Sequence, residues 1–301
     1  MAEFRSGFVA VVGKPNVGKS TLINLLLGQK IAAVSPRPQT TRRRQLGILT
    51  TETAQVVFVD TPGIHQPRHK LGQFLNQEAG EALGGVDVIL FLVDANREPD
   101  EEDRMIAALL NGLKKSPPVL LGLNKIDLLP SDLLPVRTTA YQSLLPHARL
   151  LTLSALSGAG REVLLATLVD SLPLRGPDYP PEQLTDLYER EIAGELIREA
   201  ALVFLRDEVP HGLAVRIDEF TERGETGALI GATLFVERES QKGIVIGDGG
   251  LMLKKIGSAA RKEIESMSGR KVFLQLRVKV AKDWRNDENL LRRFGFKIKK
   301  K

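Results

Sequence analysis

Residues 13–21, which read GKPNVGKST, decide how the rest of the chain is interpreted. They follow the short apolar run 8–12, which favours a buried β-strand, and they precede residues 22–27, whose composition favours a helix. The stretch fits G-x-x-x-x-G-K-S/T, a pattern typical of a phosphate-binding loop. The alternative is an ordinary turn from a strand to a helix, and the position of the full pattern between two such elements argues against it.

The residue types in this stretch suit phosphate chemistry. Glycine permits a backbone wrap that other residues resist, and the wrapped amides and the helix N-terminus form a cradle for phosphate oxygens. Lys19 would reach the β- and γ-phosphates, and Ser20 would be a ligand of Mg²⁺. The predicted phosphate-binding residues of this loop are Gly13, Asn16, Val17, Gly18, Lys19, Ser20 and Thr21.

Short β-rich runs alternate with helical patterns through the first part of the chain. The alternation predicts βαβ units, with a mostly parallel sheet covered by helices on both faces. The continuously apolar strands fit a sheet buried on both sides. The predicted strands are residues 8–12, 44–50, 55–59, 88–93, 119–123 and 150–153, and the predicted helices lie near 19–27, 71–83, 101–113, 133–144 and 162–172.

The motif VDTPG places Asp60 at the end of an apolar strand, followed by Thr61, Pro62 and Gly63. A carboxylate there can hold Mg²⁺ through water, and the Gly63 amide can sense a γ-phosphate. Ligands of open α/β sheets bind at the carboxyl ends of the strands, where this motif also lies. We therefore add Asp60 to the predicted Mg²⁺ ligands and Gly63 to the phosphate-binding residues.

Two further strand ends indicate which base is bound. LNKID ends a strand with Asn124, Lys125 and Asp127. A carboxylate accepts hydrogen bonds from N1–H and the 2-amino group of guanine, and adenine has no such pair of donors. After a third strand, the amides of Ser154, Ala155 and Leu156 can meet the guanine O6. These six residues are the predicted guanine site, and they argue against a metabolic P-loop kinase.

The loop SPRPQTTRRR, residues 35–44, has no strong structural bias. It suits a segment that γ-phosphate and Mg²⁺ order and that hydrolysis releases, although an ordinary mobile surface loop has the same composition. Thr41 is the predicted Mg²⁺-binding threonine, with Thr40 as the alternative. The predicted switch residues are Thr40, Thr41, Asp60, Thr61, Pro62, Gly63 and Ile64.

The pattern changes at PLRGPDYPP, where four prolines cannot continue a helix. We predict a first domain of residues 1–173, a linker of 174–181 and a second domain of 182–301. In the second domain we expect a helix over 182–206, strands over 213–220, 228–237, 244–246 and 271–280, a helix ending near 267 and a last helix over 284–293. The single tryptophan, Trp284, is expected in the core.

The sequence GDGG, residues 247–250, is a G-x-x-G between a predicted strand and a helix. Its surroundings resemble a KH domain, whose G-x-x-G loop clamps the backbone of about four single-stranded nucleotides. The predicted RNA-binding residues are Gly247, Asp248, Gly249, Gly250, Lys254 and Lys255, with Ile244, Val245 and Ile246 near the bases. A tight turn is the alternative, and the anionic Asp248 favours it.

Charge and composition restrict the kinds of partner and chemistry that the chain can have. Residues 241–301 carry 17 Lys and Arg against 6 Asp and Glu, which is the distribution that a phosphate backbone attracts. The chain has no cysteine, so disulfides, a cysteine nucleophile and thiolate metal sites are excluded. Without a long apolar run we expect a cytoplasmic protein. A GTPase that acts at the inner face of the membrane, with its basic end on anionic lipid, is the alternative.

Taken together, the motifs resemble those of the Era family of bacterial ribosome-assembly GTPases. The matching segments are GKPNVGKST, QTTRR, DTPGIH, NKID, SAL and QKGIVIGDGGLMLKKIG. The resemblance implies an α/β P-loop GTPase domain followed by a smaller α+β KH-type RNA-binding domain. It also implies a GTP/GDP switch, binding near the 3′ end of 16S ribosomal RNA and a role in 30S maturation, and we expect a monomer. The family usually has Lys or Asn where Asp248 and Gly249 stand.

Two positions bear on hydrolysis. Ile64 stands where Ras-type GTPases have glutamine, so it cannot orient water, and we expect slow turnover of about 10⁻⁴ to 10⁻² per second. Asn16 stands where related GTPases have an asparagine that helps to bind K⁺. The resemblance therefore implies Mg²⁺, and a K⁺ ion at Asn16, as cofactors.

Overall fold

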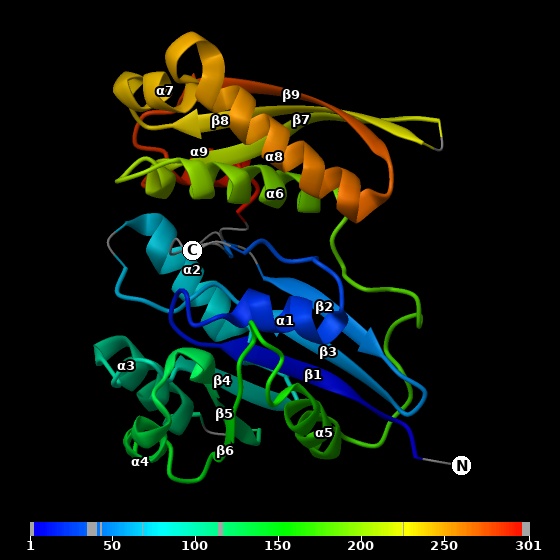
Figure 1. Ribbon diagram of the computed structural model, residues 1–301, viewed down its shortest axis with the longest axis vertical. Helices are drawn as coiled ribbons and strands as arrows, with labels where there is room; N and C mark the ends of the chain where they lie inside the picture. The colour runs from blue at the N-terminus through cyan, green and yellow to red at the C-terminus, as the bar shows by residue number, and fades with distance from the viewer. Residues whose placement is uncertain are drawn as a thin grey trace. The chain divides into compact units, whose positions relative to one another are not determined.

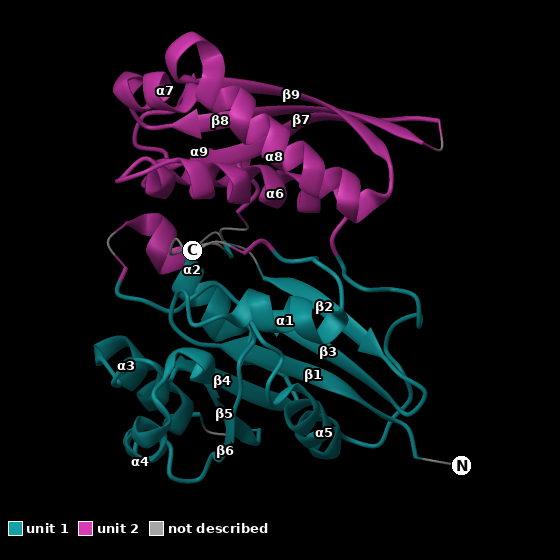
Figure 2. Ribbon diagram, in the orientation of Figure 1, with its two compact units in different colours: residues 1–32, 41–66, 75–186 teal, residues 33–40, 67–74, 187–301 magenta. Residues whose placement is uncertain are grey.

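The computed structural model describes residues 3–34, 41–42, 44–67, 69–113, 117–224 and 226–296. The chain divides into two compact units, each with its own hydrophobic core (Figure 2). The first unit comprises residues 1–32, 41–66 and 75–186, and the second comprises residues 33–40, 67–74 and 187–301.

The sheet of the first unit has six strands in the order β2-β3-β1-β4-β5-β6 (Figure 1). All neighbouring strands are parallel except β2 and β3, so the predicted mostly parallel sheet is confirmed. The strands are β1 (Arg5–Val12), β2 (Gln45–Thr50), β3 (Ala54–Asp60), β4 (Val88–Asp94), β5 (Val119–Asn124) and β6 (Arg149–Thr152).

Helices cover both faces of this sheet, which is why β3 and β4 are buried along their whole length. One face packs with α1 and α5 through Leu22 and Leu164, and the other packs with α3 and α4 through Ile106 and Tyr141. The helices are α1 (Lys19–Leu27), α2 (Lys70–Glu81), α3 (Glu101–Asn111), α4 (Leu134–Gln142) and α5 (Arg161–Ser171). The carboxyl ends of β1, β3, β4 and β5 meet at one edge, where the motifs lie.

The proline-rich segment follows α5 and belongs to the first unit. Gln55 Nε2 donates to the Tyr179 carbonyl at 2.8 Å, and the Tyr179 amide donates back to Gln55 Oε1 at 3.0 Å. The Leu46 amide donates to Asp186 Oδ1 at 2.8 Å. The change of unit falls after Asp186, whereas we predicted a linker at 174–181. Proline content marks the end of a helix, but it does not reveal where the following segment docks.

The second unit is a three-stranded sheet of order β7-β8-β9 with helices packed on it (Figure 1). β7 and β8 are antiparallel, and β9 joins β8 in parallel. Buried residues of α6, α8 and the strands form one core, which includes Leu196, Ile230 and Ile264. The elements are α6 (Glu189–Phe204), β7 (Ala214–Arg223), β8 (Gly227–Val236), α7 (Glu239–Ile246), α8 (Leu251–Ser268), β9 (Lys271–Val280) and α9 (Glu288–Arg293).

The prediction of a strand at residues 244–246 is wrong, because these residues form the last turn of α7. Gln241 Oε1 accepts from the amides of Glu237 and Arg238, at 2.9 and 3.1 Å, and so begins the helix. Val245 is fully buried while Ile244 is 51% exposed. The place beside β8 is taken by β9, so packing overrides the strand propensity of three β-branched residues.

Two helices begin later than predicted. α6 begins at Glu189 instead of residue 182, and α9 begins at Glu288 instead of residue 284. The Asp287 carboxylate caps α9 by accepting from two amides of its first turn.

Trp284 is buried, as predicted for a core residue, and its Nε1 donates to the Gly212 carbonyl at 2.8 Å. Among the described helices, none combines the length and the apolar character needed to cross a membrane.

Candidate functional site

The predicted phosphate loop turns between the end of β1 and the first turn of α1, so its residues lie in one continuous bend. Gly18 has a φ of 100°, and a Cβ there would lie 2.4 Å from Asn124 Nδ2. Glycine is therefore required at this position by both conformation and space. Asn16 is exposed with a φ of 65°, Val17 is buried, and Thr21 lies in the first turn of α1.

Lys19 lies folded over its own loop. Its Nζ donates to the carbonyls of Gly13 and Lys14, each at 3.0 Å, and the residue is only 6% exposed. Burial lowers the pKa of Lys19 to about 8, although the nearby Asp60 carboxylate acts in the opposite direction. An ammonium that is short of solvation in this way is well suited to bind phosphate oxygens.

The three predicted Mg²⁺ ligands lie together. Ser20 Oγ is 2.8 Å from Thr41 Oγ1, and the two hydroxyls donate to Asp60 Oδ2 at 2.9 and 3.2 Å. Asp60 is fully buried, and its Oδ1 has no hydrogen-bond partner within the described ranges. Burial raises the pKa of Asp60, while Lys19 and the two hydroxyls lower it. The alternative threonine, Thr40, lies outside the described residues.

The remaining predicted switch residues are tied to the phosphate loop and β1. A Cβ on Gly63 would lie 2.7 Å from Pro15 N, so this glycine permits the close approach. The Ile64 amide donates to the Gly13 carbonyl at 3.3 Å, and its side chain is buried in the core on one face of the sheet. Thr61 is buried and donates to the Val11 carbonyl, and Pro62 is also buried. Ile64 therefore faces apolar residues and cannot hold a water molecule.

Asn124 joins two predicted motifs. Its Nδ2 donates to the Val17 carbonyl at 2.7 Å, and its Oδ1 accepts from the Ala155 amide at 2.8 Å. A guanine O6 would share the Ala155 donor or take the amide of Leu156. Ser154 is buried, and its Oγ accepts from the Ser157 amide at 3.1 Å, which closes the loop. The sequence predicted Asn124 as a base-binding residue and did not reveal this bridging role.

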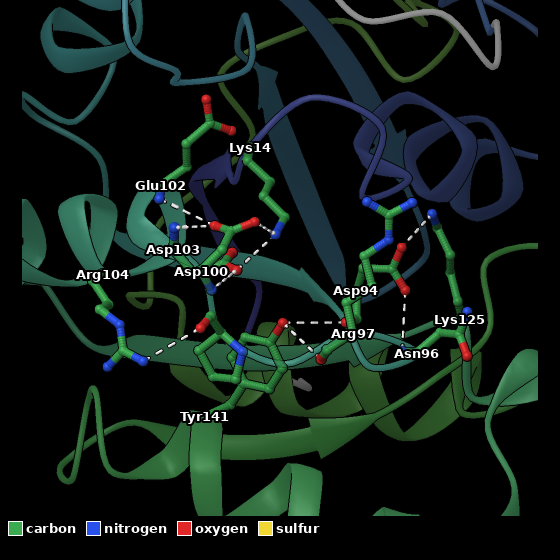
Figure 3. A network of polar contacts seen from close by, with 11 residues as sticks. Lys14, Asp94, Asn96, Arg97, Asp100, Glu102, Asp103, Arg104, Lys125 and Tyr141 are labelled. Atoms are coloured by element: carbon green, nitrogen blue, oxygen red, sulfur yellow. Dashed lines mark hydrogen bonds and ion pairs between the residues drawn. The ribbon is translucent and has the colours of Figure 1, made fainter.

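The other two residues of the guanine motif differ in exposure. Lys125 has a φ of 66°, and its Nζ pairs with Asp94 Oδ2 at 2.7 Å, at the end of β4 (Figure 3). Asp127 lies in a short 3₁₀ turn, Ile126–Leu128, and is exposed. The carboxylate that would select guanine thus lies at the surface, next to the buried Asn124.

The G-x-x-G loop joins two helices, α7 and α8, instead of a strand and a helix. Gly247, Gly249 and Gly250 have φ values of 72°, 53° and 82°, and Asp248 begins a short 3₁₀ turn between them. A Cβ on Gly247 would lie 2.6 Å from Met252 Cβ, whereas Gly249 and Gly250 have open space around them. Gly247 is therefore needed for packing, and the two other glycines leave the backbone accessible.

A groove of about 390 Å³ opens beside this loop, between α8 and β9. Lys254 and the loop residue Gly250 line it, so the predicted RNA site and the groove coincide in part. Its further lining includes Gly257, Arg261, Phe273 and Leu276. Gly257 allows β9 to approach, because a Cβ there would lie 3.3 Å from Leu276 Cδ1.

Sequence reasoning missed part of this groove. Arg261 lies seven residues after Lys254 on α8, a helical spacing that could have revealed it. The exposed aromatic ring of Phe273 carries no comparable signal. Residues 244–246 were expected beside the bases and do not line the groove. Lys255 Nζ lies 4.6 Å from the centre of the Phe204 ring, so Lys255 packs against α6.

The fold and these sites define a P-loop GTPase that carries a KH-type domain. Two family models agree with this class. The model described as 50S ribosome-binding GTPase matches residues 8–125, and the KH domain model matches residues 208–285.

Relatives identify the family. GTPase Era of Geobacter metallireducens is 48% identical over 295 residues, which cover 97% of this chain and 98% of that protein. GTPase Era of Ruminiclostridium cellulolyticum is 47% identical over 299 residues, which cover 99% of each. The chain belongs to the Era family of GTPases.

Solved structures of Era proteins are similar to this chain along nearly its whole length. One is Era in complex with MgGDPNP and nucleotides 1506–1542 of 16S ribosomal RNA, with a TM-score of 0.93, 38% identity and coverage of 98% of this chain and 100% of that one. Another is a variant of Aquifex aeolicus Era bound to GDP·AlF4⁻, with a TM-score of 0.92, 38% identity and the same coverage.

Proposed function

We propose that this GTPase binds small-subunit ribosomal RNA through its KH-type groove and assists assembly of the 30S subunit. The observation that carries the proposal is the open G-x-x-G loop beside a groove lined by Lys254, Arg261 and Phe273. Cationic side chains attract the RNA backbone, and an aromatic ring offers a face on which a base can stack. The similar Era structure with a fragment of 16S ribosomal RNA supports the choice of RNA.

The first unit would supply the nucleotide switch. The amides of residues 13–21 and Lys19 would hold the phosphates, and the Gly63 amide would meet the γ-phosphate. Ser20, Thr41 and Asp60 fit Mg²⁺, because the set contains only oxygen atoms and because Asp60 Oδ1 is buried without a partner among the described residues. A bound Mg²⁺ neutralises charge on the β- and γ-phosphates.

The base site would consist of Asn124, Lys125, Asp127 and the loop 154–156. Asp127 would accept from N1–H and the 2-amino group of guanine, and Asn124 would keep the base loop against the phosphate loop. Ile64 offers no hydrogen bond to water, so the attacking water would be positioned by other groups. This arrangement favours slow turnover in the isolated protein.

Gly250→Asp is expected to weaken RNA binding about tenfold, or about 1.4 kcal/mol, because it places an anion where phosphates approach. Gly224→Asp is the matched control, since Gly224 also has a positive φ, of 64°, and open space around it, but lies in the β7–β8 hairpin. The measurement is the affinity for RNA matching nucleotides 1506–1542 of 16S ribosomal RNA. Equal affinities for the two variants would refute the RNA assignment, and basal GTPase activity should change in neither.

The membrane alternative is tested in the same experiment with vesicles of phosphatidylglycerol. Binding to RNA that Gly250→Asp weakens, without comparable binding to vesicles, supports a cytoplasmic protein that acts on the 30S subunit. Binding to vesicles without binding to RNA would overturn the proposal that the chain acts on the 30S subunit. We also propose that the chain acts as a monomer, which sedimentation of the free protein checks.

K⁺ is expected to raise the turnover of GTP about tenfold over Na⁺, since one further cation near the developing charge would lower the barrier by about 1.4 kcal/mol. Asn16 is the proposed ligand, and it lies exposed in the phosphate loop. The rate in each salt at equal ionic strength, for the parent protein and for Asn16→Ala, is the measurement. Equal rates in K⁺ and Na⁺ for the parent protein would dismiss the proposal.

A further inference from the structure

The side chain of Lys14, the second residue of the phosphate loop, extends towards the start of α3 (Figure 3). Its Nζ lies 2.5 Å from Asp100 Oδ2 and 2.7 Å from Asp103 Oδ2. The Lys14 side chain is 7% exposed and that of Asp103 is fully buried, while Asp100 remains half exposed. These three residues, here called the Lys14 trio, join the loop to a helix that is 86 residues away in sequence.

The two carboxylates are themselves fixed by the start of α3. Asp100 Oδ1 caps the helix by accepting from the amides of Glu102 and Asp103, at 3.0 and 3.1 Å. Asp103 Oδ2 accepts in return from the Asp100 amide at 3.1 Å. This reciprocal capping leaves neither carboxylate free to follow a moving lysine. The lysine is therefore bound to a rigid partner.

Each charge in the trio affects the pKa of the others. Burial alone would lower the pKa of Lys14, but hydrogen bonds and charge attraction from both carboxylates raise it above its usual value. Burial raises the pKa of Asp103, whose Oδ1 has no hydrogen-bond partner among the residues that the structure covers. A buried cluster of charged side chains of this kind is not required for stability, since well-packed apolar side chains would stabilise the fold as well.

The backbone of Lys14 contacts Lys19, the predicted phosphate-binding lysine. The Lys14 carbonyl is one of the two carbonyls that accept from Lys19 Nζ. The loop before α3 also reaches the base motif, because Asp94 pairs with Lys125. Tyr141 is fully buried, and its hydroxyl contacts the carbonyls of Asp94 and Arg97, each at 3.2 Å, which fixes that loop (Figure 3).

We propose that Lys14, held by Asp100 and Asp103, is a positioning residue for guanine-nucleotide binding. The trio fixes the Lys14 carbonyl and so keeps Lys19 and the loop amides in the arrangement that accepts phosphates. Without the trio, nucleotide binding would also have to order the loop. The affinity would fall by the free energy that this ordering costs. This inference rests on the nucleotide site proposed above.

Asp100→Asn is the decisive variant. Asparagine caps a helix as well as aspartate does, so α3 is retained while one of the two charges that hold Lys14 is lost and only that of Asp103 remains. We expect GDP to bind the variant about three- to tenfold more weakly. Simple electrostatics predicts the opposite sign, because removing a carboxylate near a phosphate site favours an anion. The matched control is Glu101→Gln, which removes an exposed carboxylate from the same helical turn and should leave the affinity unchanged.

Two further variants examine the lysine itself. Lys14→Met should weaken GDP binding about tenfold, and Lys14→Arg should recover most of the loss because the charge returns. Calorimetric titration of GDP with Mg²⁺ gives the affinities, and urea unfolding of the nucleotide-free proteins gives stability separately. Weaker binding by folded Asp100→Asn, with recovery by Lys14→Arg, supports the proposal. A loss of stability without a change in affinity overturns it.

The proposed nucleotide site and the inference fail in different ways. If the parent protein gives no heat with GDP, the site and the inference are both refuted. If the parent protein binds GDP and Asp100→Asn binds it as tightly as Glu101→Gln does, the inference alone is refuted.

Discussion

Lys19→Ala is expected to abolish binding of GTP and GDP at micromolar concentrations. The variant removes the ammonium that would bond to the β- and γ-phosphates of GTP and to the β-phosphate of GDP, and charge-assisted hydrogen bonds contribute about 1.5–3 kcal/mol each. The loss of two such bonds lowers the affinity for GTP by about 10²–10⁴-fold, and the loss of one lowers the affinity for GDP by about 10–10²-fold. Calorimetric titration with each nucleotide in the presence of Mg²⁺ measures the effect.

Arg104→Ala is the control for this variant. Arg104 is an exposed cation on α3, and its guanidinium donates a long hydrogen bond, of 3.4 Å, to the Pro99 carbonyl. The substitution removes one positive charge from the same unit, away from the phosphate loop, and should leave the affinity unchanged. If Lys19→Ala folds and binds GTP as tightly as Arg104→Ala does, the phosphate site is assigned incorrectly.

Asp127→Asn is expected to change the preferred base from guanine to xanthine. An asparagine amide can still accept from N1–H, but it donates to the carbonyl that xanthine carries in place of the 2-amino group. GTP should bind about 10²–10⁴-fold more weakly, since two charge-assisted hydrogen bonds are lost, and xanthosine triphosphate should recover most of the affinity. Competition between the two nucleotides gives the ratio.

Asp132→Asn is the matched control for the base. Asp132 is exposed and lies in the neighbouring 3₁₀ turn, Ser131–Leu133, so the same change of charge is made close to Asp127. Its preference for GTP should equal that of the parent protein. A parent protein that binds ATP and GTP equally well, or an Asp127→Asn variant that still prefers GTP, would contradict the assignment of the guanine site.

Much of the nucleotide site could be predicted from sequence because its chemistry is local to strand ends. Ser20 and Asp60 each follow or end a recognisable strand, and a parallel sheet brings such ends to one edge. The third oxygen ligand, Thr41, could be chosen by residue type within a loop that has no regular pattern. The structure places these three oxygen groups within 3.2 Å of one another.

The remaining features depend on packing between distant residues, for which one sequence carries no signal. Nothing in the local pattern pairs Lys14 with Asp103. The two polar atoms of Asn124 are divided between two loops only because β5 ends between them. Residues 244–246 have a strand-like composition, yet α7 ends there because β9 occupies the place beside β8. Propensity is a local quantity, and it fails where tertiary contacts decide.

The bridging of two loops by Asn124 has a consequence for protein engineering. Because both polar atoms of this buried side chain are engaged within the protein, position 124 belongs to the frame of the proposed base site. Asp127, three residues later, is exposed. Under the guanine assignment proposed above, nucleotide preference would be modular: the frame would stay intact while one exposed residue is altered to accept a different base.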